Sequence, residues 1–292
     1  MTTFVDAEIS SQPDVWRLAG ELAATVSTDL PARGERVAVV GCGTSWFIAA
    51  SYAALRESAG DGLTDAFAGS EYPSGRDYDR VVAISRSGTT TEIIELLSGL
   101  SAPSTLITAV PDAPAAQHAD AVVGMGFADE KSVVQTRFAT SALTLLRSSL
   151  TSRPDLDALV EHGRRALEVP IEDLLGAGQV TFLGRGWTVG LASEAALKTR
   201  EAAQFWAESY PAMDYRHGPI AIAQPGRLVW SFGPAPEGLT EDVAATGATL
   251  VQHDLDPQAA LVVAQRFAIG LAKARDLDPD RPRSLTRSVI LG

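Results

Sequence analysis

The stretch VAVVGCGTSWFIAASYAAL, residues 37–55, joins an apolar run to a helical pattern through a Gly-x-Gly turn. A second stretch, VTFLGRGWTVGLASEAAL at residues 180–197, follows the same plan. The first glycines of the two turns, Gly41 and Gly184, lie 143 residues apart (184 minus 41). This repetition predicts two copies of one α/β unit, each beginning with a buried strand that turns sharply into a helix.

Apolar runs alternate with helical patterns along the rest of the chain as well. We expect strands at 36–41, 80–85, 104–110, 121–126, 179–184, 227–233 and 248–253, and helices at 45–59, 90–99, 132–151, 187–207, 238–246 and 257–275. Near-continuous apolar strands that alternate with helices are typical of parallel sheets covered on both faces. The sequence therefore predicts an α/β protein that binds ligands at the loops following its strands.

Composition limits the function classes that need to be considered. The 292 residues, 46% of them hydrophobic, suffice for one large domain or two ordinary ones. A formal net charge of −12 argues against general nucleic-acid binding, but a local pocket can still attract a small anion. The single cysteine, Cys42, excludes an intramolecular disulfide and a multi-cysteine metal site, and the four histidines show no metal-ligand spacing. We therefore expect neither a metal nor another cofactor.

The N-terminal residues MTTFVDAEISSQPDVW contain no basic start followed by an apolar run, so no signal peptide is visible. No apolar segment of the sequence reaches the length that crosses a membrane. We accordingly expect a soluble cytoplasmic protein without a membrane partner.

The stretch SRSGTTTE, residues 85–92, holds five hydroxyl side chains between a predicted strand and a predicted helix. A helix cap needs one hydroxyl, so Ser87 or Thr89 alone would suffice for that purpose. Several hydroxyls, with the free amides and the dipole of a helix N-terminus, favour a bound phosphate monoester instead. Arg86 either assists this phosphate or points to solvent.

The Gly-x-Gly turns are weaker signals. A dinucleotide-binding fingerprint has a third glycine where this chain has Trp46 in the first turn and Val189 in the second. Taken alone, the first turn reads as a tight strand–helix connection with Thr44 or Ser45 as the helix N-cap.

Together, GCGTS at 41–45 and SRSGTTTE at 85–92 resemble the sugar isomerase (SIS) domain family. The segment GRGWTVGLASEAALKTREAAQFWAESYPAMDYRHGPIA, residues 184–221, is similar to the second SIS domain of glucosamine-6-phosphate synthases. The resemblance implies two flavodoxin-like SIS subdomains, each a parallel sheet flanked by helices, at residues 15–152 and 176–292. The helical spacing at 153–175 and the Pro154 start predict a connector helix between them.

The resemblance also implies a set of residues that bind the sugar phosphate. A serine/threonine loop after the third strand holds the phosphate in this family, and a later loop approaches the sugar. The implied binding residues are Gly43, Thr44, Ser45, Ser85, Arg86, Ser87, Thr90, Val134, Gln135 and Arg287.

Glu194, Lys198 and Glu201 lie on one face of a predicted helix because their spacing is i, i+4, i+7. From spacing alone, a solvent-exposed ion-pair stripe is the simpler interpretation. The resemblance instead implies that Glu201 moves a proton between C1 and C2 of the sugar, a role that suits a carboxylate. It further implies that Lys198 stabilises an enediolate oxygen and that His217 assists ring opening across a dimer interface.

Two departures from the synthases affect the expected reaction. The chain begins Met1-Thr2-Thr3, so we expect no glutaminase domain. Arg287 stands where the family has a lysine that forms a Schiff base, and a guanidinium is no imine-forming amine. Arg287 can instead bind a carboxylate, hydroxyl or phosphate of the substrate.

These features predict a homodimeric phosphosugar aldose–ketose isomerase, or an isomerising deaminase or deglycase. Its substrate would be an amino-sugar or fructosamine phosphate. The alternative is a non-catalytic phosphosugar-binding regulatory SIS protein, which would need the phosphate loop but not Glu201. A DNA-binding regulator would need an added helix-turn-helix, and none is apparent in the first 35 residues.

Overall fold

The structure, a computed structural model, describes residues 3–291. Met1, Thr2 and Gly292 lie outside the described residues. The expectation for the N-terminus rests partly on the first two, and the predicted end of the second domain falls on the third. The chain divides into two compact units. The five-stranded unit comprises residues 11–131, 135–160 and 286–291, and the four-stranded unit comprises residues 3–10, 132–134 and 161–285. Each is described by itself.

The five-stranded unit contains one parallel sheet with the strand order β2-β1-β3-β4-β5. This is the flavodoxin-like order, and it confirms the predicted fold class. The strands are β1 (Val37–Gly41), β2 (Thr64–Ala68), β3 (Arg80–Ile84), β4 (Ser104–Thr108) and β5 (Ala121–Gly124). The helices are α2 (Gln12–Thr25), α3 (Thr44–Ser58), α4 (Thr91–Gly99), α5 (Arg137–Ser148) and the 3-10 turns η1 (Gly69–Glu71), η2 (Pro114–His118) and η3 (Gly126–Ala128).

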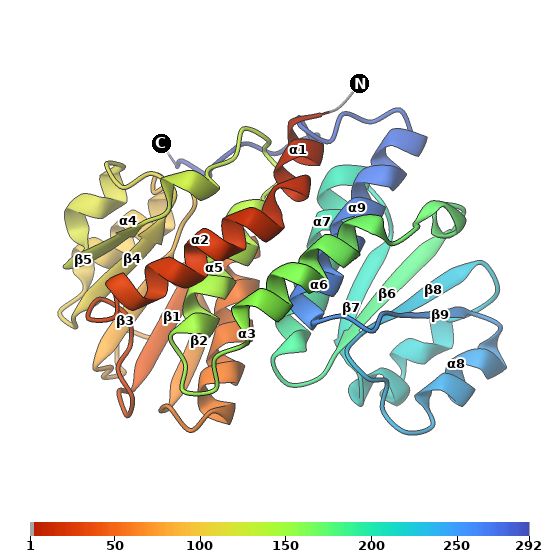
Figure 1. The fold of residues 1–292 in the computed structure, drawn as a ribbon, viewed down its shortest axis with the longest axis horizontal. Helices are drawn as coiled ribbons and strands as arrows, with labels where there is room; N and C mark the ends of the chain where they lie inside the picture. The colour runs from red at the N-terminus through yellow and green to blue at the C-terminus, as the bar shows by residue number, and fades with distance from the viewer. Residues whose placement is uncertain (1–2, 292) are drawn as a thin grey trace. The chain divides into compact units, whose positions relative to one another are not determined.

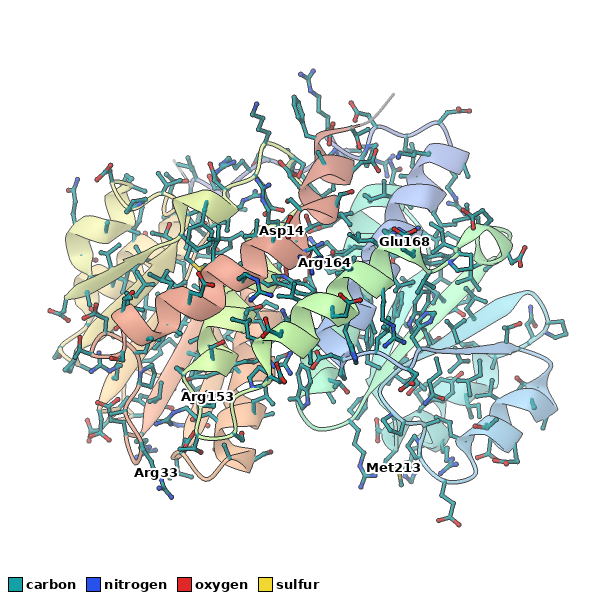
Figure 2. All side chains as sticks on the ribbon, in the orientation of Figure 1. Asp14, Arg33, Arg153, Arg164, Glu168 and Met213 are labelled. Atoms are coloured by element: carbon teal, nitrogen blue, oxygen red, sulfur yellow. The ribbon has the colours of Figure 1, made fainter. Side chains whose placement is uncertain are left out.

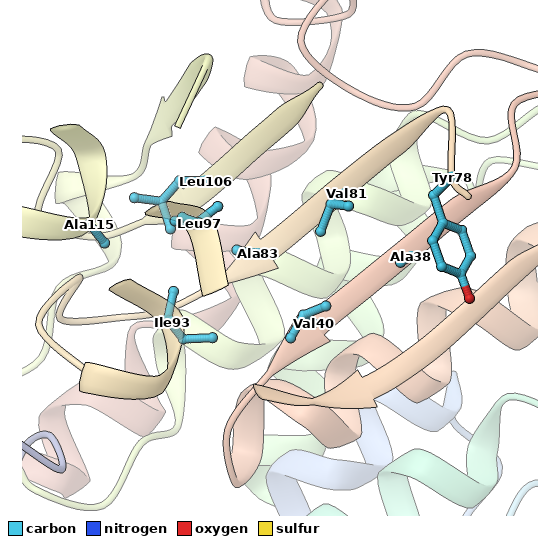
Figure 3. Close-up of a cluster of buried hydrophobic side chains, with 9 residues drawn as sticks. All are labelled: Ala38, Val40, Tyr78, Val81, Ala83, Ile93, Leu97, Leu106 and Ala115. Atoms are coloured by element: carbon cyan, nitrogen blue, oxygen red, sulfur yellow. The ribbon is translucent and has the colours of Figure 1, made fainter. Parts of the chain in front are cut away.

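Alternate residues of the buried strands pack on opposite faces of this sheet. Side chains of β1, β3 and β4 meet those of α4 on one face, as Figure 3 shows. That cluster consists of Ala38, Val40, Tyr78, Val81, Ala83, Ile93, Leu97, Leu106 and Ala115. Helix α3 packs on β1 and β2 and also contacts α5, which in turn packs on α2. Helices therefore cover the sheet and leave the loops at the strand ends to carry the site.

The four-stranded unit repeats this plan with one strand fewer. Its parallel sheet has the order β7-β6-β8-β9. This order matches β2-β1-β3-β4 of the other sheet, with β6 corresponding to β1, β7 to β2, β8 to β3 and β9 to β4. The strands are β6 (Gln179–Gly184), β7 (Ala207–Pro211), β8 (Arg227–Phe232) and β9 (Thr249–Gln252). The helices are α1 (Phe4–Ser10), α7 (Thr188–Ala203), α8 (Leu239–Thr246), α9 (Pro257–Ala274) and the 3-10 turns η4 (Glu172–Leu174), η5 (Asp214–His217) and η6 (Pro219–Ile222). Helix α7 packs against β6, β7 and α9 (Figure 1).

Helix α6 (Leu156–Glu168) occupies much of the stretch predicted as a connector, and its residues are divided between the two units. The domain boundaries at 152, 175 and 176 stay a prediction. Charged side chains such as Asp14, Arg33 and Glu168 lie on the surface, together with the half-exposed Met213 (Figure 2). Within residues 3–291, no helix combines the length and the apolar character that crossing a membrane requires.

Several elements differ from their sequence predictions. The strands β2 and β7 were not predicted, because each is a partly exposed edge strand that lacks a continuous apolar run. Helices α1 and α2 occupy residues 4–25, where no helix was expected; α2 buries Trp16 and packs on α5. Helix α5 begins at Arg137, not 132, because the carboxylate of Glu130 accepts the amide hydrogens of Thr136 and Arg137 and fixes the helix start there.

Candidate functional site

The five-stranded sheet reverses its strand order at β1 and β3, which lie side by side. Gly41, the last residue of β1, pairs with Ile84, the last residue of β3. The loop before α3 and the loop 85–90 before α4 therefore leave the sheet at neighbouring strand ends. In open α/β sheets this reversal is the place where ligands bind.

Two glycines shape the first loop. A Cβ atom on Gly41 would lie 2.5 Å from the backbone of Ser45, so only glycine allows α3 to follow the strand this closely. Gly43 has φ +55° and is the N-cap of α3, without a side-chain cap hydrogen bond. Thr44 and Ser45 are therefore the first helical residues and not the predicted caps. Within residues 3–291, their buried hydroxyls have no hydrogen-bond partner, so they remain able to bind a ligand.

In loop 85–90, the serine hydroxyls accept hydrogen bonds from the loop itself. The Ser85 hydroxyl oxygen accepts from the Gly88 amide at 3.2 Å. The Ser87 hydroxyl oxygen accepts from the amide and the hydroxyl of Thr89, at 3.2 and 3.0 Å. Both serines are buried, with 5% and 7% of their surface exposed. Because each hydroxyl here acts as an acceptor, its own hydrogen is left to donate to another group.

The helix-cap explanation for these hydroxyls is wrong. Thr90 is the N-cap of α4, and its side chain makes no cap hydrogen bond. Neither Ser87 nor Thr89 donates or accepts at a helical amide within the described chain. The hydroxyls of Ser87 and Thr89 therefore do not cap α4, whose first amide, that of Thr91, donates instead to the Val289 carbonyl oxygen.

Gly88 fixes the turn of this loop. It has φ +62°, and an added Cβ would lie 2.6 Å from the Cβ of Ala113. We predict that Gly88→Ala lowers the free energy of unfolding by about 2–4 kcal/mol through backbone strain and overpacking. Gly99→Ala is the control, because nothing lies within 4 Å of its added Cβ and the helical position favours alanine. Urea unfolding of both variants measures the difference, and equal midpoints would contradict the prediction.

The segment 286–291 lies against loop 85–90. The Thr89 and Ser288 hydroxyls are hydrogen-bonded to each other at 2.8 Å, and the Thr91 amide donates to the Val289 carbonyl at 3.2 Å. The guanidinium of Arg287 pairs with the carboxylate of Asp129. The structure thus places the predicted binding residue Arg287 beside the loop, with a carboxylate of its own chain as partner.

Arg86 does not point to solvent, because only 5% of its surface is exposed. Its guanidinium lies 3.6 Å from the carboxylate of Glu130 and donates to the Arg287 carbonyl oxygen at 3.1 Å. Asp129 and Glu130 were not among the predicted site residues. The acidic pair directly before the KSVVQTR segment, residues 131–137, is the signal in the sequence, but nothing in that pattern identifies the residues that Asp129 and Glu130 contact.

Cys42 follows β1 within the same region. Its thiol donates to the Glu92 carboxylate at 3.5 Å. Burial, and secondarily the charge of Glu92, raise the pKa of Cys42 to about 11. The thiol is therefore protonated near neutral pH and is not a nucleophile there.

In the four-stranded unit, α7 buries the predicted acid–base group. Glu194 and Lys198 are 0% and 2% exposed, and the Lys198 ammonium lies 3.7 Å from the Glu194 carboxylate. The same ammonium pairs with the carboxylate of Glu201, whose side chain is 19% exposed. The exposed ion-pair stripe is thus excluded. A carboxylate that is mostly buried yet still reachable is suited to proton transfer.

His217 is exposed in η5 of the same unit. Within the described residues it forms no hydrogen bond or ion pair with Glu201 or Lys198. Glu208, on β7, accepts hydrogen bonds from the Trp206 indole at 2.8 Å and the Tyr210 hydroxyl at 3.0 Å. These contacts give Glu208 a local structural role.

Val134 and Gln135 fall in different units. Val134 is 1% exposed, and its carbonyl oxygen accepts a hydrogen bond from the Ser132 hydroxyl at 2.8 Å. Gln135 is partly exposed and belongs to the five-stranded unit. Their approach to the sugar stays a prediction.

The four-stranded sheet offers an internal comparison for loop 85–90. The equivalent loop follows β8 and reads GPAPEG at residues 233–238, without a single hydroxyl side chain. The loop after β6 keeps the glycine geometry, since a Cβ on Gly184 would lie 2.2 Å from the Thr188 carbonyl oxygen. The same scaffold thus carries the hydroxyl cluster in only one of the two units. The hydroxyls of loop 85–90 are therefore not a requirement of the fold.

Among residues 3–291, no group of three or more His, Cys, Asp or Glu side chains is arranged to hold a metal ion.

Known proteins share this architecture. The crystal structure of glucosamine-6-phosphate deaminase from Thermotoga maritima matches with a TM-score of 0.85 at 23% identity, over 99% of this chain and 100% of that one. Tagatose-6-phosphate ketose/aldose isomerase from Escherichia coli matches with a TM-score of 0.79 at 18% identity, over 95% of each chain. At these identities the likeness establishes the fold alone.

Related sequences point the same way. The isomerizing glutamine–fructose-6-phosphate aminotransferases of Aeropyrum pernix and Gloeobacter violaceus are 29% and 27% identical to this chain, over 75% and 99% of it. The chain spans 45% and 58% of the lengths of these two relatives. The SIS domain family model matches residues 32–151, which include the Gly-x-Gly turn and loop 85–90. Residues 32–151 of this chain are thus similar to the SIS domain family.

Proposed function

We propose that the protein is a phosphosugar aldose–ketose isomerase, or an isomerising deaminase or deglycase, acting on an amino-sugar or fructosamine phosphate. Loop 85–90, with Gly43, Thr44 and Ser45, binds the phosphate group. Glu201 moves the proton between C1 and C2, and Lys198 stabilises the enediolate oxygen. The relatives' names, which include a deaminase and two kinds of isomerising enzyme, support this reaction class.

The observation that carries the proposal is the hydrogen-bonding state of Ser85 and Ser87. Their oxygens accept from the loop, and their hydrogens are left to donate beside the N-terminus of α4. A phosphate monoester offers the acceptor oxygens and the negative charge that these groups favour.

Binding and turnover are measured separately. Calorimetry with glucosamine 6-phosphate and fructose 6-phosphate measures binding, and NMR in deuterated water follows exchange of the C2 proton. Binding with exchange supports the enzyme. Binding without exchange supports the alternative, a non-catalytic phosphosugar-binding protein, and the absence of binding would overturn both.

We predict that Ser87→Ala raises the dissociation constant for a bound sugar phosphate by about 10- to 100-fold, because a hydrogen bond to a charged group contributes about 1.5–3 kcal/mol. Ser98→Ala is the control: its hydroxyl donates to the Glu95 carbonyl at the far end of α4. Equal affinities of the two variants would show that loop 85–90 does not hold the phosphate.

The proposal includes the homodimer that the resemblance implies, in which His217 serves the site of the other copy. Light scattering during size-exclusion chromatography measures the mass, and mixing Glu201→Gln with His217→Ala tests the sharing. A site shared in this way predicts partial recovery of exchange in the mixture, whereas no recovery would contradict it.

A further inference from the structure

The carboxylate of Glu130 lies buried at the N-terminus of α5. One of its oxygens accepts hydrogen bonds from the Thr136 amide at 2.7 Å, the Thr136 hydroxyl at 2.8 Å and the Arg137 amide at 2.7 Å. The other oxygen accepts from the Phe138 amide at 3.3 Å. These amides have no partner within the helix, and the negative charge opposes the positive end of its dipole. Glu130 is therefore anchored by the helix.

The same carboxylate faces Arg86. The Arg86 and Glu130 side chains are 4% and 0% exposed, and a guanidinium nitrogen of Arg86 lies 3.6 Å from a carboxylate oxygen of Glu130. The main chain of Arg86 is also held, since its carbonyl oxygen accepts from the Ala109 amide at 3.1 Å and from the Thr108 hydroxyl at 3.2 Å. Arg86 is thus fixed at both its side chain and its backbone.

Arg86 stands between Ser85 and Ser87, the residues whose hydroxyl hydrogens are left to donate. A guanidinium that served as a direct phosphate ligand would be aimed at the ligand and not paired in the interior. A buried charge without a partner is costly, so an arginine at this position requires an acidic neighbour. Glu130 supplies that neighbour, and α5 holds it in place.

We propose that Arg86 and Glu130 form a positioning pair. Glu130 holds the Arg86 guanidinium inside the unit, and the fixed Arg86 keeps the hydroxyls of Ser85 and Ser87 directed at the phosphate. The inference rests on the phosphate site of the proposed function and adds Glu130 to it. It assigns Arg86 a supporting role in place of direct contact with the phosphate.

The direction in which Glu130→Gln changes the phosphate affinity distinguishes direct phosphate binding by Arg86 from a positioning role. If Arg86 contacts the phosphate directly, Glu130→Gln removes a competing negative charge and tightens binding. If the pair positions the loop, Glu130→Gln loosens Arg86 and weakens binding. Glutamine retains an oxygen that can accept from the α5 amides, so the change removes the charge while keeping the size of the side chain.

The experiment measures dissociation constants for inorganic phosphate and glucosamine 6-phosphate with four proteins: wild type, Glu130→Gln, Arg86→Met and the double variant. We expect each single change to raise both dissociation constants by about tenfold. The double variant is expected to bind no more weakly than the weaker-binding of the two single variants, because the residues act as a unit. Glu95→Gln, on the exposed face of α4, is the matched control and binds as the wild type does.

Two further readouts exclude a purely structural role. Exchange at C2 under saturating substrate stays within about threefold of wild type, because the pair acts on binding and not on the chemistry. Arg86→Lys keeps a cation beside Glu130 and is expected to recover most of the affinity that Arg86→Met loses. It replaces Glu130→Gln as the test if that variant does not fold. Unchanged or tighter phosphate binding by Glu130→Gln, or additive single effects, would overturn the inference and leave the proposed function standing. A wild type that binds no phosphate would overturn both.

Discussion

Glu201→Gln is expected to slow C2 proton exchange by about 10²- to 10⁴-fold, the contribution typical of a general base. Glutamine has nearly the same shape, and its oxygen can still accept from the Lys198 ammonium, which pairs with Glu201 in the wild type. It cannot accept a proton from carbon. NMR in deuterated water measures the exchange, and calorimetry is expected to show a dissociation constant within about threefold of wild type.

The control for this prediction is Glu21→Gln, which changes an exposed carboxylate on α2. It is expected to exchange at the wild-type rate. A Glu201→Gln protein that binds the sugar phosphate and still exchanges the proton at that rate would assign the chemistry to another residue.

Lys198→Met is expected to lower the free energy of unfolding by about 3–5 kcal/mol, because it removes the cation beside a buried carboxylate. The Glu194 side chain is fully buried, and Lys198 is 2% exposed. Urea unfolding measures the loss. Adding Glu194→Gln to this variant removes the buried charge as well and is expected to recover part of the stability.

Lys273→Met is the matched control, since Lys273 also pairs with a carboxylate, that of Asp6, at 2.7 Å. Those two side chains are 45% and 25% exposed, so solvent screens the pair and its loss is expected to cost about 0–1 kcal/mol. Similar losses of unfolding free energy in the two variants would show that the burial of Lys198 on α7 does not increase its contribution to stability.

The interior strands could be predicted from the sequence because burial on both faces leaves a continuous apolar run. Strand β6, Gln179–Gly184, was predicted with its observed bounds. The edge strands β2 and β7 could not be predicted in this way, because their residues TDAFA and AESYP contain no continuous apolar run. The other two edge strands, β5 and β9, do contain short apolar runs and were predicted. Helix α2 was missed for a related reason: its apolar face becomes evident only once α5 is known to cover it.

The site residues likewise divide into those that a local sequence pattern reveals and those that only the folded structure reveals. Loop 85–90 was recognisable because its hydroxyl residues lie close together in sequence and are more numerous than a helix cap needs. Glu130 was not, because its significance lies in the proximity of Arg86, 44 residues earlier in the chain (130 minus 86). Hydrogen bonds between distant segments leave no periodic pattern, so the partners of Arg86 and Arg287 become visible only in three dimensions.

The hydroxyl-free loop 233–238 has a consequence for stoichiometry. Two sheets of like topology suggest two equivalents of ligand, but only one of them carries the hydroxyl cluster in the loop after its β3 or equivalent β8 strand. A titration with a sugar phosphate should accordingly saturate at one molecule per polypeptide.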